Sequence, residues 1–140
     1  MDDTGYECIL YYLEKLNKYK TEKKKKNVCD LPINLFIYKT CKKFKINNEM
    51  IYLTYINIRK AIKKNRLEYN NNTIFYVWYV YLMIIHKYLV DIPYTNKLWA
   101  KIIDEKLEYI NTLERRFLDC IDYTIERGNL IKIDFEILFK

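Results

Sequence analysis

Hydrophobic residues recur at intervals of three and four along most of the chain, which is the spacing of one face of an α-helix. Ile51, Tyr55 and Ile58 show this interval clearly. Polar or proline-containing segments separate the stripes and predict the breaks between helices. The predicted amphipathic helices cover approximately residues 6–20, 32–45, 48–62, 97–103 and 106–124.

Residues 74–90 have a different pattern, because they are apolar on every side. The segment contains only two basic residues, His86 and Lys87, at its end. Its aromatic and β-branched residues favour a strand, but seventeen residues without a turn signal are too long for an ordinary one. A helix that is apolar all round is surrounded by other helices. We therefore predict a buried central helix, and its longest apolar run, residues 74–85, is too short to span a bilayer.

The pattern after residue 128 supports two interpretations. Gly128 is a typical residue to stop the preceding helix. From Ile131 to Ile137 apolar and charged residues alternate, which fits a short strand. A terminal helix starting at Asp134 fits equally well.

Composition narrows the fold and function classes. A chain of 140 residues is of single-domain size. Only two glycines and two prolines are present, which argues against an all-β fold and its many turns. Glycine-rich phosphate-binding loops are excluded as well. We expect an all-α fold.

The formal net charge of +7 is concentrated in one part of the chain. Residues 15–26 contain seven lysines against Glu22, so the remainder is nearly neutral. The basic run, including Lys20–Lys26, fits a solvated linker, a nuclear import signal or a weak contact with an acidic surface or nucleic acid. The near-neutral remainder argues against a nucleic-acid-binding domain.

The sequence gives little support for a catalytic site or a metal site. Cys8, Cys29, Cys41 and Cys120 have no C-x-x-C spacing, and His86 is the single histidine. The chain contains no serine, so a nucleophile–base pair is unsupported. We expect no enzyme activity, no metal, no cofactor and no small-molecule substrate. Without a recognisable signal peptide, we expect the nucleus, the cytoplasm or both.

Two motifs carry a family resemblance. The first is HKYLVDIPYTNKLWAK at residues 86–101. It resembles the A-K-[FY]-x-x-D-x-x-Y-x-N-x-x-[WY]-A segment of the phosphate-pathway and PCL-type (P-type) cyclins of fungi. The second is INTLERRFLDCIDY at residues 110–123, which resembles the N-x-L-E-x-x-F-L-x-x-[LI]-[DN]-[FY] signature of that family and of cyclin Y.

The resemblance implies a cyclin box: a five-helix bundle around the buried central helix, with an additional N-terminal helix. It divides the chain into an N-terminal helix and basic linker (1–28), the box (29–128) and a C-terminal segment (129–140). It implies a regulatory subunit that binds and activates a cyclin-dependent kinase by positioning the kinase αC helix. The implied kinase-binding residues are Lys87, Glu114, His86 and Leu118. The implied structural motif residues are Asp91, Tyr94, Asn96, Trp99, Leu113 and Phe117.

The residues themselves leave alternatives. Lys87 ends an apolar helix, so its charge needs a partner or an exit to water, and Glu114 is also compatible with ordinary surface. Ile85 and His86 stand where the family usually has small residues, which indicates either a reshaped docking surface or an unusual partner. The M-R-x-x-L docking motif is absent, and residues 36–41 read FIYKTC. The alternative function is a cyclin-fold nucleic-acid-binding protein resembling transcription factor IIB, or a scaffold, without kinase activation.

Overall fold

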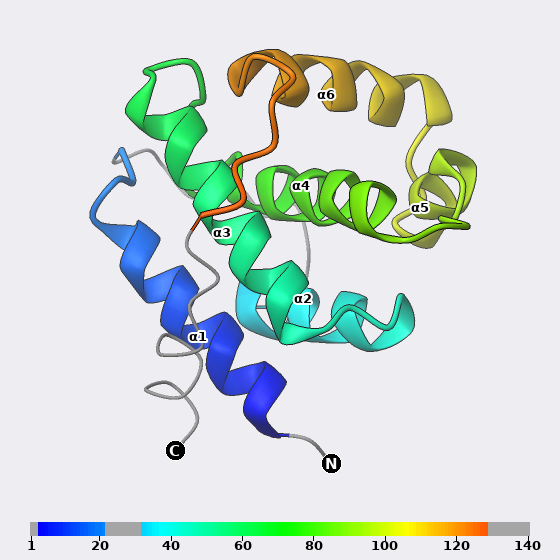
Figure 1. Cartoon of the computed structure of the whole chain (residues 1–140), viewed down its shortest axis with the longest axis horizontal. Coiled ribbons are helices and arrows are strands. Elements are labelled where there is room, and N and C mark those ends of the chain that lie inside the picture. Colours follow the sequence, from blue (N-terminus) through cyan, green and yellow to red (C-terminus); the bar gives the residue numbers. More distant parts are fainter. Residues whose placement is uncertain (1–2, 22–31, 129–140) are drawn as a thin grey trace.

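Six α-helices form the regular structure in the computed structural model, which describes residues 3–21 and 32–128 (Figure 1). No strand occurs among these residues. The prediction of an all-helical fold, with one helix before residue 30 and five after it, is confirmed. The helices are α1 (Asp3–Asn17), α2 (Ile33–Lys43), α3 (Asn48–Lys63), α4 (Ile74–Leu89), α5 (Asn96–Ile102) and α6 (Leu107–Cys120).

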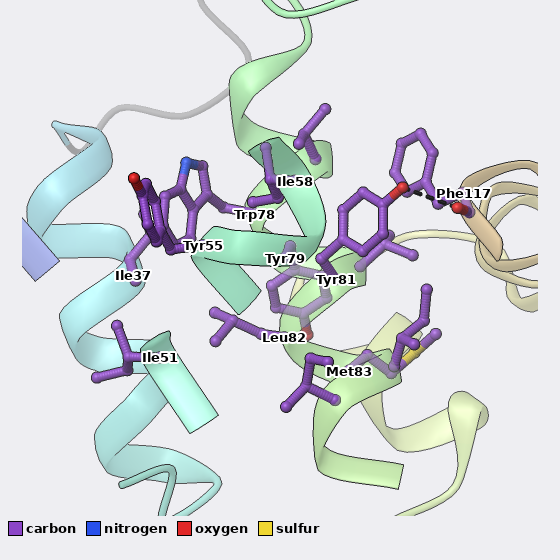
Figure 2. Packing of buried hydrophobic residues seen from close by; sticks show 14 of the residues in the cluster. Ile37, Ile51, Tyr55, Ile58, Trp78, Tyr79, Tyr81, Leu82, Met83 and Phe117 are labelled. Carbon is purple, nitrogen blue, oxygen red and sulfur yellow. Dashed lines mark hydrogen bonds between the residues drawn. The ribbon is translucent and has the colours of Figure 1, made fainter. Parts of the chain in front are cut away.

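Helix α4 is the predicted central helix. Every residue from Ile74 to His86 except Tyr76 is buried, and α2, α3 and α6 pack around it. Figure 2 shows its aromatic side chains pointing in different directions: Tyr81 points towards α6, whereas Trp78 points away from it. The buried polar atoms of these rings are satisfied. The indole of Trp78 donates to the Tyr69 hydroxyl at 3.0 Å, and the Tyr81 hydroxyl donates to the Phe117 carbonyl at 2.7 Å. This agrees with the rule that buried polar groups find partners.

Helix α1 contributes to the same hydrophobic core. Ile9, Leu13 and Leu16 are buried as the stripe predicted, and α1 packs on both α2 and α3. Leu10, which sits beside this stripe, is instead partly exposed. The proposed division at residues 28 and 128 stays a prediction, since residues 22–31 and 129–140 lie outside the described part.

The end of α6 differs from the prediction. The stripe through Ile121 predicted a helix to about Thr124 with a stop at Gly128, but α6 ends at Cys120. Asp122 and Tyr123 adopt φ values of 55° and 56°, which turn the backbone out of the helix. Ile121 is still fully buried, although it lies in the turn. Because Ile121 is apolar and fits the helical spacing, the sequence pattern extended the predicted helix beyond Cys120, where α6 ends.

Residues 121–128, here called the C-terminal strap, run back across α3 (Figure 1). The buried Asn57 side chain of α3 accepts from the Glu126 amide at 2.8 Å and donates to the Glu126 carbonyl at 2.9 Å. The Lys60 ammonium donates to the Thr124 carbonyl at 2.9 Å. These hydrogen bonds attach the C-terminal strap, which follows α6, to α3. The predicted strand or helix beyond it lies outside the described residues.

Candidate partner-binding site

Lys87 lies at the end of α4, where three helices meet. Its ammonium donates to Glu114 Oε2 at 2.7 Å and to Asn96 Oδ1 at 3.0 Å. The sequence predicted that the Lys87 charge needs either a partner or access to water. In the structure its partner is the Glu114 carboxylate. The sequence resemblance placed Lys87 and Glu114 on one surface, and the structure shows them as a direct ion pair.

Asn96, at the start of α5, bonds both members of this ion pair. Its amide nitrogen donates to Glu114 Oε1 at 3.1 Å and to Asn111 Oδ1 at 2.9 Å. The local fold explains its position: the Thr95 hydroxyl accepts from the Leu98 amide and caps α5, which makes Asn96 the first residue of that helix. Asn111 and Glu114 are three residues apart and share one face of α6.

The four residues Lys87, Asn96, Asn111 and Glu114, here called the polar cluster, are only partly exposed. The Lys87 side chain is 35% exposed and that of Glu114 is 16% exposed. Sequence reasoning treated Asn96 as purely structural and assigned no role to Asn111. The i, i+3 spacing of Asn111 and Glu114 was the available signal, but it did not show that Asn96 would join them.

Apolar side chains lie exposed near the polar cluster in the sequence. Tyr88, Leu89 and Tyr94 are each more than a third exposed, and Ile92 in the loop between α4 and α5 is 89% exposed. Leu118, the fourth predicted contact residue, is partly buried against the core.

His86 has a different environment from its neighbour Lys87. It is 3% exposed, its ring stacks on Tyr94 with centroids 5.3 Å apart, and it meets Trp99 edge-on. Burial lowers the pKa of its imidazole below the ordinary value. Consecutive helical residues point about 100° apart, so one enters the core while the other reaches the surface. His86 is therefore covered by Tyr94 in this structure, and its contact with a partner stays a prediction.

The structural motif residues divide into core and surface. Trp99 is fully buried and stacks on Phe44 with centroids 3.6 Å apart. Leu113 and Phe117 are buried on the inner face of α6. Asp91 is exposed, in the loop that follows α4.

The described residues were also predicted to hold no metal site and no membrane span. Within residues 3–21 and 32–128, no group of three or more histidine, cysteine or acidic side chains is placed to hold a metal ion. Cys8, Cys41 and Cys120 are buried free thiols, and burial raises the pKa of the Cys8 thiol to about 12. None of the described helices is both long enough and apolar enough to cross a membrane.

A bundle of six helices around a buried central helix, with no strand among the described residues, is consistent with the helical fold of a cyclin box. The family model described as Cyclin matches residues 8–125 of this chain. Because this match spans most of the sequence, the chain belongs to the cyclin family. Its members are regulatory and not catalytic proteins. A search of curated proteins and a search of solved structures found no match.

Proposed function

We propose that this protein is a single-box cyclin of the P-type that binds a cyclin-dependent kinase and activates it. The Lys87–Glu114 pair, held by Asn96, is the observation that carries the proposal. The side chains of Lys87 and Glu114 are partly exposed, so a partner can reach them. Their hydrogen bonds to each other and to Asn96 already fix their positions in the free chain. The proposed site of action is the nucleus, the cytoplasm or both.

The polar cluster retains hydrogen-bonding capacity for a partner. A lysine ammonium has three donors, and Glu114 and Asn96 accept two from Lys87. Each Glu114 oxygen accepts one described bond, from Lys87 or Asn96, and has a second lone pair. One donor and two acceptor positions thus suit backbone groups of a kinase. Because the side chains are already ordered, binding loses less conformational entropy.

The proposed mechanism is a population shift in the kinase. A kinase is active when its αC glutamate pairs with its active-site lysine. A cyclin that binds only this arrangement stabilises it. Moving the equilibrium from about 1:99 to 99:1 requires roughly 5.5 kcal/mol of differential affinity. A standard interface of about 800 Å² per partner is large enough to supply this.

The structure defines a control bait for identifying the kinase. In the charge-swapped variant Lys87→Glu/Glu114→Lys, the two side chains can still pair, and the Asn96 amide can turn to serve either charge. The domain should stay folded while the polarity shown to a partner is reversed. The native chain should capture a cyclin-dependent kinase from its own cell extract, identified by mass spectrometry, and the swapped variant should not. A folded native bait that captures no such kinase contradicts the proposal.

The captured kinase then allows the contact to be measured by calorimetry. Glu114→Ala should weaken binding by roughly 2–5 kcal/mol, because it leaves Lys87 without its carboxylate at a buried contact. Glu108→Ala is the matched control, since Glu108 is an exposed acidic residue on the same helix. Its effect should stay under about 0.5 kcal/mol. Equal effects of the two variants would remove Glu114 from the interface.

A further inference from the structure

A second surface feature lies between the end of α1 and the second half of α3. It is a groove of about 490 Å³, here called the basic groove. In Figure 1 the end of α1 and α5 lie on opposite sides of the molecule, so this groove is remote from the polar cluster. The residues that line it are Tyr11, Glu14, Lys15, Lys18, Tyr19, Tyr55, Arg59 and Lys63.

Positive charge is arranged in two short rows along the basic groove. Lys15 lies in the last turn of α1 and Lys18 in the turn that follows it. Arg59 and Lys63 are four residues apart and share one face of α3. Glu14 is the single acidic residue of the lining. Two opposed rows of cations match a ligand with several negative charges along its length better than one small anion.

Tyrosine rings support these cations. Lys15 lies over Tyr11 at 4.8 Å, Lys18 over Tyr19 at 5.1 Å, and Arg59 over Tyr55 at 5.3 Å from the ring centroids. Arg59 also donates to the Tyr55 hydroxyl at 3.2 Å. Cation–π contacts hold a charged group in place while leaving its positive charge intact.

The neighbouring cations of the same region have a different environment. Lys64 and Arg66 both pair with the Asp122 carboxylate, which neutralises part of their charge. These contacts hold the pKa of Asp122 down to about 2. The described contacts of Lys15, Lys18 and Arg59 are with rings instead, so the basic groove remains a positive surface.

We propose that the basic groove binds an acidic segment of a partner protein, an extended peptide rich in aspartate and glutamate. Charge complementarity identifies the ligand as an anion, and a groove of about 490 Å³ suits a single extended chain. Single-stranded nucleic acid binds through bases stacked on open aromatic faces. Here cations already cover one face of Tyr11, Tyr19 and Tyr55, and the Tyr55 ring is buried. The geometry therefore favours the peptide.

The basic groove is separate from the proposed kinase contact, because the groove and the polar cluster share no residue. An acidic segment could occupy it while a kinase is bound elsewhere on the molecule. Binding of an acidic segment to the basic groove therefore does not require a bound kinase.

Fluorescence anisotropy with the full chain tests the proposal. The probes are a labelled octapeptide of alternating Asp and Glu, its Asn/Gln counterpart and an eight-residue oligothymidylate. The groove variant carries Lys15→Gln, Lys18→Gln, Arg59→Gln and Lys63→Gln. The matched control carries Lys23→Gln, Lys24→Gln, Lys25→Gln and Lys26→Gln, which removes the same charge from the neighbouring lysine run.

The acidic octapeptide should bind the native chain and the control variant with similar affinity and the groove variant about tenfold or more weakly, because four charge contacts are lost. Its binding should weaken with salt, and the Asn/Gln peptide should not bind. Absence of acidic-peptide binding, an equal loss in both variants, or groove-dependent binding of the oligothymidylate alone would overturn the proposal.

A second variant covers the case in which four substitutions unfold the chain. Lys18→Glu/Lys63→Glu changes two exposed residues and reverses the sign at the rim of the basic groove. This variant should lose the acidic octapeptide and gain affinity for an octapeptide of alternating Lys and Gly. Retained binding of the acidic peptide by this folded variant would also overturn the proposal.

Discussion

Asn57 offers a sharp test of how the C-terminal strap is held, because its fully buried side chain joins parts of the chain 69 residues apart. Its amide oxygen accepts from the Glu126 backbone, and its amide nitrogen donates both to the Glu126 carbonyl and to the Leu53 carbonyl at 2.8 Å. Substitution by alanine removes all three bonds. The Glu126 amide and carbonyl then lose the partners that fix them on α3.

The expected cost follows from these contacts. Each of the two bonds to the strap is worth about 1 kcal/mol net, and the side chain leaves a small cavity that adds about 1 kcal/mol. Asn57→Ala should therefore lower the free energy of unfolding by about 3 kcal/mol. For a domain of this size the midpoint of thermal unfolding should fall by about 10 °C.

Urea unfolding followed by circular dichroism measures this difference, and hydrogen exchange localises it to the Glu126 amide. Lys60→Ala is the control, because Lys60 lies on the same helix and also donates to the strap, at Thr124, from an exposed ammonium. That variant should lose under about 1 kcal/mol. If Asn57→Ala costs no more than the Lys60 variant, or if Glu126 stays equally protected, the strap is not held by this buried amide.

Two further predictions concern His86 and Gly128. Burial lowers the folded-state pKa of His86, so the unfolded chain binds a proton on this residue more readily than the folded chain does. The free energy of unfolding should therefore decrease as the pH falls from 7.5 to 5.5. Because His86 is the single histidine, His86→Phe should flatten this dependence in thermal melts, and an unchanged slope would contradict the assignment. Gly128 has a φ of 58°, and a Cβ there would lie 2.7 Å from Ile56 Cδ1 and 2.8 Å from the Tyr52 hydroxyl. Gly128→Ala should therefore cost about 1–2 kcal/mol in urea unfolding, and an unchanged midpoint would show that the strap end shifts freely.

The helices could be predicted because each buries a regular face. For α3 and α4 the burial pattern and the end signals agree, so the predicted ranges lie within one residue or so of the observed ones. The end of α6 could not be found in this way. Ile121 is buried from a turn, and periodicity alone does not distinguish a buried helical residue from a buried turn residue.

The candidate site was predictable only in part. The motif resemblance selected Lys87 and Glu114, but their pairing depends on how α5 and α6 return towards α4. That return runs through Asp104, whose φ of 52° turns the chain between the two helices. Aspartate is enriched at positive φ, but most aspartates adopt other backbone conformations, so Asp104 did not indicate this turn in the sequence. For this reason Asn96 could be recognised as part of a motif without any indication of the bonds that it makes.

The basic groove shows why charge along the sequence is an incomplete guide to charge on the surface. The sequence assigned Lys15 and Lys18 to a linker-like run and the remainder of the chain to near neutrality. Packing of α1 on α3 places both lysines beside Arg59 and Lys63, more than forty residues away in the sequence. The near-zero net charge of the remainder did not show that Arg59 and Lys63 would line one groove with Lys15 and Lys18.

The bulky pair Ile85-His86 lies directly before Lys87 in α4. In place of the small residues usual in the family, it indicated either a reshaped docking surface or an unusual partner. Both side chains are buried, and the imidazole is accommodated inward, between Tyr94 and the Trp99 edge. The added volume is therefore absorbed mainly by the aromatic core. Tyr94, which covers the His86 ring while remaining partly exposed, is the residue through which this departure from the family pattern would reach a partner.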